Sequence, residues 1–157
     1  MLREAIVDVH TSKRSVSFLD QFMKELTNDK KDKRYSECVA GYKLWAGKKE
    51  LVCSGCSTAD WTSGDLEVRV NPELGLRING SEHVIKLYFK QVPLSKLRVD
   101  SVLHLLKTTL PAKQRTAVPG ILDVPNAKLH TPTVVQDDIG ALLAGEAAAF
   151  SSMWKRV

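Results

Sequence analysis

Lys86 is the residue whose position in this sequence most suggests chemistry. It lies inside the apolar stretch "HVIKLYFK" at 83–90, and Glu73 opens the preceding apolar stretch "ELGLRI". Burying an ammonium group is costly unless the group is paired, so a lysine placed in this way usually has a partner or a role. An acid and a lysine side by side can form an ion pair, and they can also belong to a catalytic or anion-binding site.

The two apolar stretches predict a β-hairpin, because the Asn-Gly pair at 79–80 is typical of a type I′ turn. If the turn has two residues, Glu73 lies directly opposite Lys86. If the loop has four residues, Glu73 faces Tyr88 and lies diagonal to Lys86. In both registers the acid and the lysine are within reach of each other. The simplest interpretation is an ion pair across the strands, and the alternative is a functional site.

Three basic residues follow the hairpin into the next predicted helix, namely Lys90, Lys96 and Arg98. The chain has 157 residues and a formal net charge of +5, which is compatible with a polyanionic partner without requiring one. We expect these residues to contact the phosphates of a nucleic acid. The competing interpretation is a solvated charged face.

The cysteines do not form a strong motif. An odd number of thiols, Cys38, Cys53 and Cys56, in a chain without an export signal indicates reduced cysteines. A structural zinc ion needs four ligands, usually as two close pairs, so one CxxC at 53–56 does not lead us to expect zinc. The residues after it do not have a helical pattern, which disfavours a thioredoxin-type role.

The elements that must position these residues follow from the spacing of apolar side chains. Helices are predicted over 15–27, 33–47, 94–110 and 135–154. Strands are predicted within 51–64 and 65–71, in the hairpin, and at 120–124 and 127–130, whereas the polar run 28–34 is expected to be a loop. We therefore expect one α/β (α+β) domain with a small mixed sheet of three to five strands, a central hairpin over about 73–90, and flanking helices. Its expected parts are a helical part over about 1–48, a sheet core over about 50–133 and a final helix over about 135–155.

This order of elements resembles the PD-(D/E)xK nuclease-like superfamily, whose restriction-endonuclease-like core is α-β-β-β-α-β. The pair Pro-Glu at 72–73 looks like the first motif element, and Val-Ile-Lys at 84–86 lies where the acid-x-Lys triplet would be. The resemblance covers about residues 33–130. The sequence departs from the pattern at Val84, which replaces the acid of the triplet. Asp100 on the following helix is the acid that the resemblance offers instead.

The resemblance implies a metal-dependent phosphodiester hydrolase. Glu73 and Asp100 would hold Mg²⁺, and Lys86 would orient the attacking water or stabilise the transition state. Glu37 is the position for a further acid from the preceding helix, although we expect its side chain to be solvated. The alternative is that the metal site is absent and that the fold serves as a protein or nucleic-acid binding module.

The sequence also gives expectations about location and assembly. It has no apolar run of about 18 residues, so no membrane segment is expected. The N-terminal stretch has Glu4 and Asp8 among its apolar residues and lacks the core of a signal peptide, which favours a cytoplasmic location. We also keep a homodimer as an expectation, because dimers are the commonest assemblies of small domains.

Overall fold

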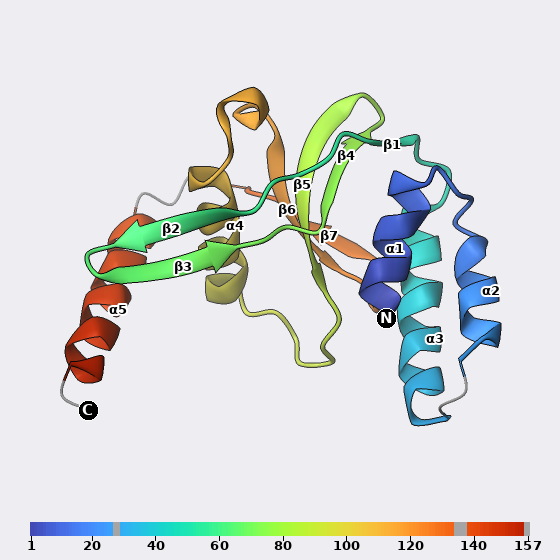
Figure 1. Cartoon of the computed structure of the whole chain (residues 1–157), viewed down its shortest axis with the longest axis horizontal. Helices are drawn as coiled ribbons and strands as arrows, with labels where there is room; N and C mark the ends of the chain where they lie inside the picture. Colours follow the sequence, from blue (N-terminus) through green and yellow to red (C-terminus); the bar gives the residue numbers. More distant parts are fainter. Residues whose placement is uncertain (27–28, 134–137, 156–157) are drawn as a thin grey trace.

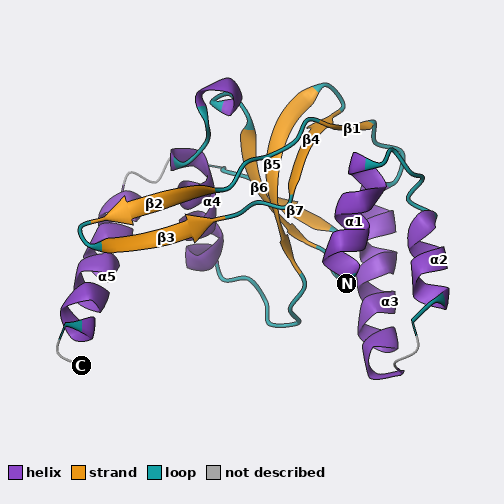
Figure 2. Cartoon of the chain, viewed as in Figure 1, coloured by secondary structure: helices purple, strands orange, loops and turns teal. Residues whose placement is uncertain are grey.

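The computed structural model describes residues 1–26, 29–133 and 138–155. Within these ranges the chain forms five α-helices, one short 3₁₀-helix and seven strands (Figure 1; Figure 2). The helices are α1 (Leu2–Thr11), α2 (Phe18–Lys24), α3 (Asp29–Ala46), α4 (Lys96–Thr108) and α5 (Asp138–Trp154), and the 3₁₀-helix is Ala112–Gln114. The strands are β1 (Leu51–Cys53), β2 (Ala59–Ser63), β3 (Leu66–Val70), β4 (Leu74–Ile78), β5 (Ser81–Tyr88), β6 (Val118–Asp123) and β7 (Lys128–His130).

The main sheet has five strands in the order β1-β4-β5-β6-β7. Its neighbouring strands are antiparallel except for β5 and β6, which run parallel. A parallel pair requires a crossover connection, and α4 lies in that connection. The predicted α/β (α+β) architecture, a mixed sheet with a central hairpin flanked by helices, is therefore confirmed.

The hairpin of β4 and β5 turns at Asn79 and Gly80. Both residues have positive φ, 47° and 89°, as a type I′ turn requires. Leu74 pairs with Ile85, which is the register of the two-residue turn. The four-residue alternative is excluded, and Glu73 precedes β4 directly opposite the position of Lys86.

Strand β5 separates two apolar regions of the core. Ile85 and Leu87 belong to a cluster with buried side chains of α1 and α3, whereas Val84 packs with Leu106 of α4 on the other face. Figure 1 shows α1, α2 and α3 together on one side of the main sheet. Gly41 lets α3 approach the chain after β6, because a Cβ at this position would lie 2.1 Å from the Val124 carbonyl oxygen.

Strands β2 and β3 form a separate two-stranded sheet that extends away from the main sheet, with α5 beside it (Figure 2). The sequence predicts a strand and a loop over 51–64, whereas the structure contains two strands there, β1 and β2. The residues of β2 alternate in burial, but Trp61 is its one large apolar residue, so the apolar signal for this strand in the sequence is weak.

The predicted loop over 28–34 is wrong, because α3 already begins at Asp29. Lysine and arginine favour helices, so a charged run can extend one. Helix α2 is shorter than the predicted 15–27, and residues 27–28 and 135–137 of the predictions lie outside the described residues. None of the helices in the described ranges is long and apolar enough to cross a membrane.

Candidate functional site

The predicted contact between Glu73 and Lys86 is present. Lys86 Nζ lies 2.8 Å from Glu73 Oε1. Lys86 comes from the second strand of the hairpin, and Glu73 comes from the residue just before the first strand. The type I′ turn therefore sets the register that brings the two side chains together.

The Lys86 ammonium group has three acceptors. Besides Glu73 it donates to the main-chain carbonyl of Asn71 at 2.8 Å and to Asn71 Oδ1 at 3.1 Å. An ammonium group has three N–H donors, so these contacts use its full capacity. Lys86 thus fixes the connection between β3 and β4, and its side chain is 31% exposed.

The Glu73 carboxylate is also occupied by protein donors. Its Oε1 accepts from Lys86 and lies 3.2 Å from Arg3 Nε, and its Oε2 accepts from the Leu87 main-chain N–H at 2.8 Å. The side chain is 9% exposed. Oε2 keeps one lone pair beyond these contacts, whereas the two cations at Oε1 disfavour a metal ion there. A magnesium site at Glu73 therefore gains no support from these contacts and stays a prediction.

Val84 lies where the acid of the motif would be. It is 1% exposed and packs in an apolar cluster with Val70, Leu106 and Ala117. A carboxylate here would be buried among apolar side chains at considerable cost. The departure from the motif at Val84 thus contributes to the packing of β5 against α4.

Asp100 lies on α4 and accepts from Lys96 Nζ at 2.5 Å. It also lines a pocket of about 440 Å³ together with His104 and Lys107. Neither Glu73 nor Lys86 lines this pocket. A shared metal site of Glu73 and Asp100 therefore gains no support from these contacts, and it stays a prediction.

Among the described residues we also searched for other groups of side chains that could hold a metal ion. There, no group of three or more His, Cys, Asp or Glu side chains is placed to hold a metal ion. Glu37 is exposed, as expected. Burial raises the pKa of the Cys38 thiol and of the Cys56 thiol, which keeps both in the less reactive protonated form. Cys53 is an exposed free thiol.

The three predicted nucleic-acid contacts Lys90, Lys96 and Arg98 are all exposed. They lie on the connection from β5 to α4 and on the first turn of α4. Ser95 caps this helix by accepting from the Arg98 main-chain N–H at 3.2 Å, and the first turn contains no acid. We call these three residues the basic surface.

A second pocket, of about 240 Å³, lies at the start of α1, and its lining residue Arg3 also contacts Glu73. Its lining includes Arg3, Arg34, Tyr35 and Phe89. Arg34 donates to the Phe89 carbonyl at 3.3 Å, and the Arg3 guanidinium lies 5.4 Å from the centre of the Phe89 ring. These residues are far apart in the sequence, so sequence analysis alone did not group them.

Asp123 is a further residue that sequence analysis did not select. It ends β6 opposite Tyr88, is 6% exposed, and accepts from Asn126 Nδ2 at 2.9 Å. Its Oδ1 has no hydrogen-bond partner among the described residues. An acid at the carboxyl end of a buried parallel strand is the signal that could have singled it out.

The fold and the site define an α+β domain in which Lys86 of the central hairpin binds Glu73 and Asn71, the latter in the connection from β3 to β4. No family model, curated protein or solved structure matches the chain.

Proposed function

We propose that this domain binds nucleic acid through the basic surface and that Glu73 and Lys86 stabilise the fold without performing hydrolysis. The observation that carries the proposal is the exposure of Lys90 and Arg98 beside the N-terminus of α4, whose first turn contains no acid; Lys96 is exposed there too and pairs with Asp100 one turn further on. Helix N-termini favour anions because their N–H groups and dipole point toward them. Lysine and arginine at the same place add the charge that phosphate contacts require.

The neighbouring pocket supports the same proposal. Arg3 and Arg34 add two guanidinium groups near the end of β5, where Lys90 begins the basic surface. Tyr35 and Phe89 are half-buried and line the same pocket, where Tyr35 stacks on Phe22 and the Arg3 guanidinium lies over Phe89. Aromatic and guanidinium groups of this kind can contact unpaired bases. Single-stranded nucleic acid is therefore the form we expect to bind more tightly.

The order of elements agrees with the nuclease-like fold that the sequence resembles, which supports nucleic acid as the ligand. From α3 the chain continues through β1, β4 and β5 to α4 and β6, with the β2–β3 hairpin inserted after β1. This is the α-β-β-β-α-β order that the resemblance implies. The burial of Val84 and the protein contacts of Glu73 favour its non-catalytic form. A cytoplasmic location belongs to the same proposal, because the exposed thiol of Cys53 would stay reduced there.

Fluorescence anisotropy with labelled single-stranded DNA, duplex DNA and RNA of one sequence tests the proposal. We expect binding that weakens steeply as salt is added, because lysine and arginine release counterions from phosphates. We also expect the labelled strands to stay intact in magnesium. Binding that is absent at low salt, or that does not change with salt, would contradict the basic surface.

Metal-dependent hydrolysis is the second candidate, and the 2.8 Å contact of Glu73 with Lys86 is the observation in its favour. Titration calorimetry with Mg²⁺ and Mn²⁺ separates the two candidates. If Glu73 and Lys86 only stabilise the fold, any metal binding to the wild type should be unchanged in Glu73→Gln. Metal binding that this substitution abolishes, together with cleavage of the labelled strands, would favour hydrolysis.

A further inference from the structure

Helix α5 uses a small part of its surface for packing within the chain. Only Ile139 and Ala147 of this helix are buried, and its main contacts are with α4, β2 and β3. Between Asp138 and Lys155 the sequence contains one charged side chain, Glu146. Water-exposed helices usually have several charged side chains. The low charge of α5 therefore indicates that another surface covers it.

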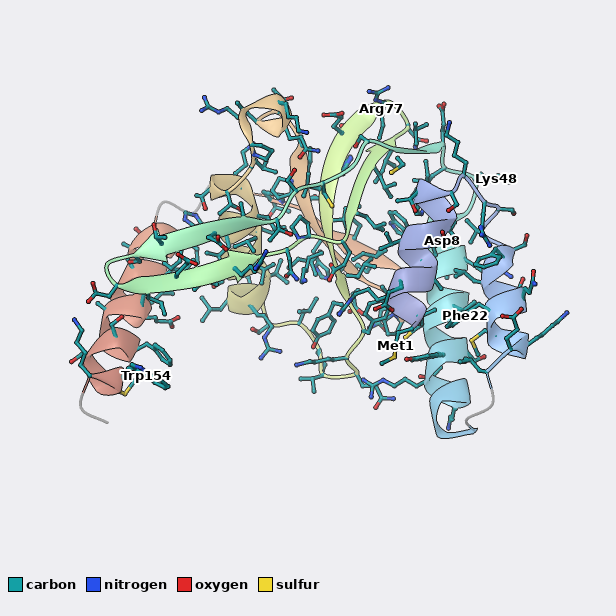
Figure 3. The ribbon with its side chains drawn as sticks, viewed as in Figure 1. Met1, Asp8, Phe22, Lys48, Arg77 and Trp154 are labelled. Carbon is teal, nitrogen blue, oxygen red and sulfur yellow. The ribbon has the colours of Figure 1, made fainter. Side chains whose placement is uncertain are left out.

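The exposed face of α5 is smooth and nearly free of charge. At 100° per residue, the side opposite Ile139 and Ala147 consists of small residues with two larger apolar ones at its margin. The small residues Ala141, Ala144, Gly145, Ala148, Ala149 and Ser152 are all exposed, and Leu142 and Met153 are 42% and 61% exposed. Small side chains at four-residue spacing let two helix backbones approach closely. Figure 3 shows Trp154 near the end of α5, away from the main sheet.

The two ends of this face have opposite charges. Asp138 begins the helix and is exposed, and Lys155 follows its last residue with 68% of its side chain exposed. Lys155 donates to Asp65 at 2.6 Å, which uses one of the three donors of its ammonium group. A partner helix that runs antiparallel would bring an acid to this lysine if the partner had the same sequence.

We propose that α5 is the interface of a homodimer, in which two copies of the helix pack antiparallel about the point between Glu146 and Ala147. This arrangement places Ala141 opposite the partner's Ser152 and Gly145 opposite the partner's Ala148, so small residues meet along the contact. The same arrangement places Asp138 opposite the partner's Lys155 at both ends. Antiparallel packing also sets the two helix dipoles in opposite directions. The charge pattern therefore favours a second copy of this chain over other occupants of the face.

Sedimentation velocity of the full chain, from about 1 to about 200 µM, tests the dimer. We expect a monomer–dimer equilibrium that Ala148→Glu shifts to monomer by at least about tenfold in Kd, since it buries a carboxylate at the contact. Glutamate favours helices nearly as well as alanine, so the variant should fold. Leu44→Glu on α3 is the matched control, because Leu44 is also an exposed apolar helix residue, and it should dimerise like the wild type.

Exchange of the end charges tests the direction of the helices. In an Asp65→Asn background, which removes the intrachain partner of Lys155, Asp138→Lys alone and Lys155→Asp alone should each weaken the dimer, and the combination of both should restore it. Asp65→Asn should leave the dimer intact, since it removes only the contact within the chain. A chain that is monomeric at every concentration, a dimer unaffected by Ala148→Glu, or a double variant without recovery would overturn the proposal. A monomer that floats with anionic phospholipid vesicles through α5 would overturn it in favour of a membrane surface.

Discussion

Lys86 holds Glu73 across the central hairpin, with 2.8 Å between Nζ and Oε1. The same ammonium group binds the main chain and side chain of Asn71, two residues before Glu73. Lys86 therefore has a structural role in its apolar strand, because it connects the loop before β4 to the middle of the sheet.

Removing either partner should destabilise the chain. Lys86→Met leaves Glu73 nearly buried with fewer donors, and Glu73→Gln leaves Lys86 without its carboxylate. Each should lower the free energy of unfolding by about 1–3 kcal/mol. In a double-mutant cycle measured by urea unfolding, the two effects should couple by about 1 kcal/mol or more.

The pair Lys96 and Asp100 is the matched control for this cycle. Its lysine is 70% exposed, so the coupling should be about 0.5 kcal/mol or less. If the Glu73–Lys86 coupling is no larger than that of the control, the pair does not stabilise the fold in the way we describe.

Restoring the acid of the motif should damage the fold. Val84→Asp puts a carboxylate into the cluster with Leu106 and Ala117, and it should cost about 3 kcal/mol or more. Val84→Thr keeps the shape and adds one hydroxyl, so it should cost about 1–2 kcal/mol. Thermal unfolding of both variants gives the comparison. A Val84→Asp protein that is as stable as the wild type and cleaves nucleic acid with magnesium would contradict the structural interpretation of Val84.

His10 should make stability depend on pH. It is 7% exposed and hydrogen-bonded to Tyr42, and burial lowers its pKa below the ordinary 6.5. The unfolded chain then binds a proton more readily than the folded one, so stability should fall as the pH drops through 6.5 toward the lowered pKa. The free-energy difference between the wild type and His10→Gln, measured by urea unfolding, should shrink from pH about 7.5 to about 5.

Tyr42→Phe is the control for this pH dependence. It removes the hydroxyl group but keeps the burial that lowers the pKa of His10, so the loss of stability at low pH should persist. An equal pH dependence in the wild type and His10→Gln would show that another group is responsible.

The local part of the site could be predicted from the sequence. The Asn-Gly pair at 79–80 determines the turn, the turn determines the register, and the register places Glu73 opposite Lys86. The element order around this hairpin followed from the spacing of apolar residues. These signals are contained within about twenty residues, which is why a sequence pattern can carry them.

The contacts that give the pair its role could not be predicted. Arg3 comes from α1, and Asn71 reaches Lys86 because of the path that the chain takes from β3 into β4. Both depend on tertiary packing, for which a single sequence has no periodic signal. The separate β2–β3 sheet was missed because β2 is short and Trp61 is its one large apolar residue, which leaves a weak apolar signal in the sequence.

The most direct test of the proposed function compares two double variants that remove the same charge. Lys90→Gln/Arg98→Gln alters the basic surface. Lys48→Gln/Arg77→Gln removes two exposed charges elsewhere, with Arg77 near the turn of the hairpin and Lys48 after α3 (Figure 3). The measurement is the affinity for single-stranded DNA as a function of salt. We predict that the first variant binds at least about tenfold more weakly and with a salt slope smaller by about 1.4, whereas the second binds like the wild type. Equal losses in both variants would show that binding follows net charge alone and would contradict a defined basic surface.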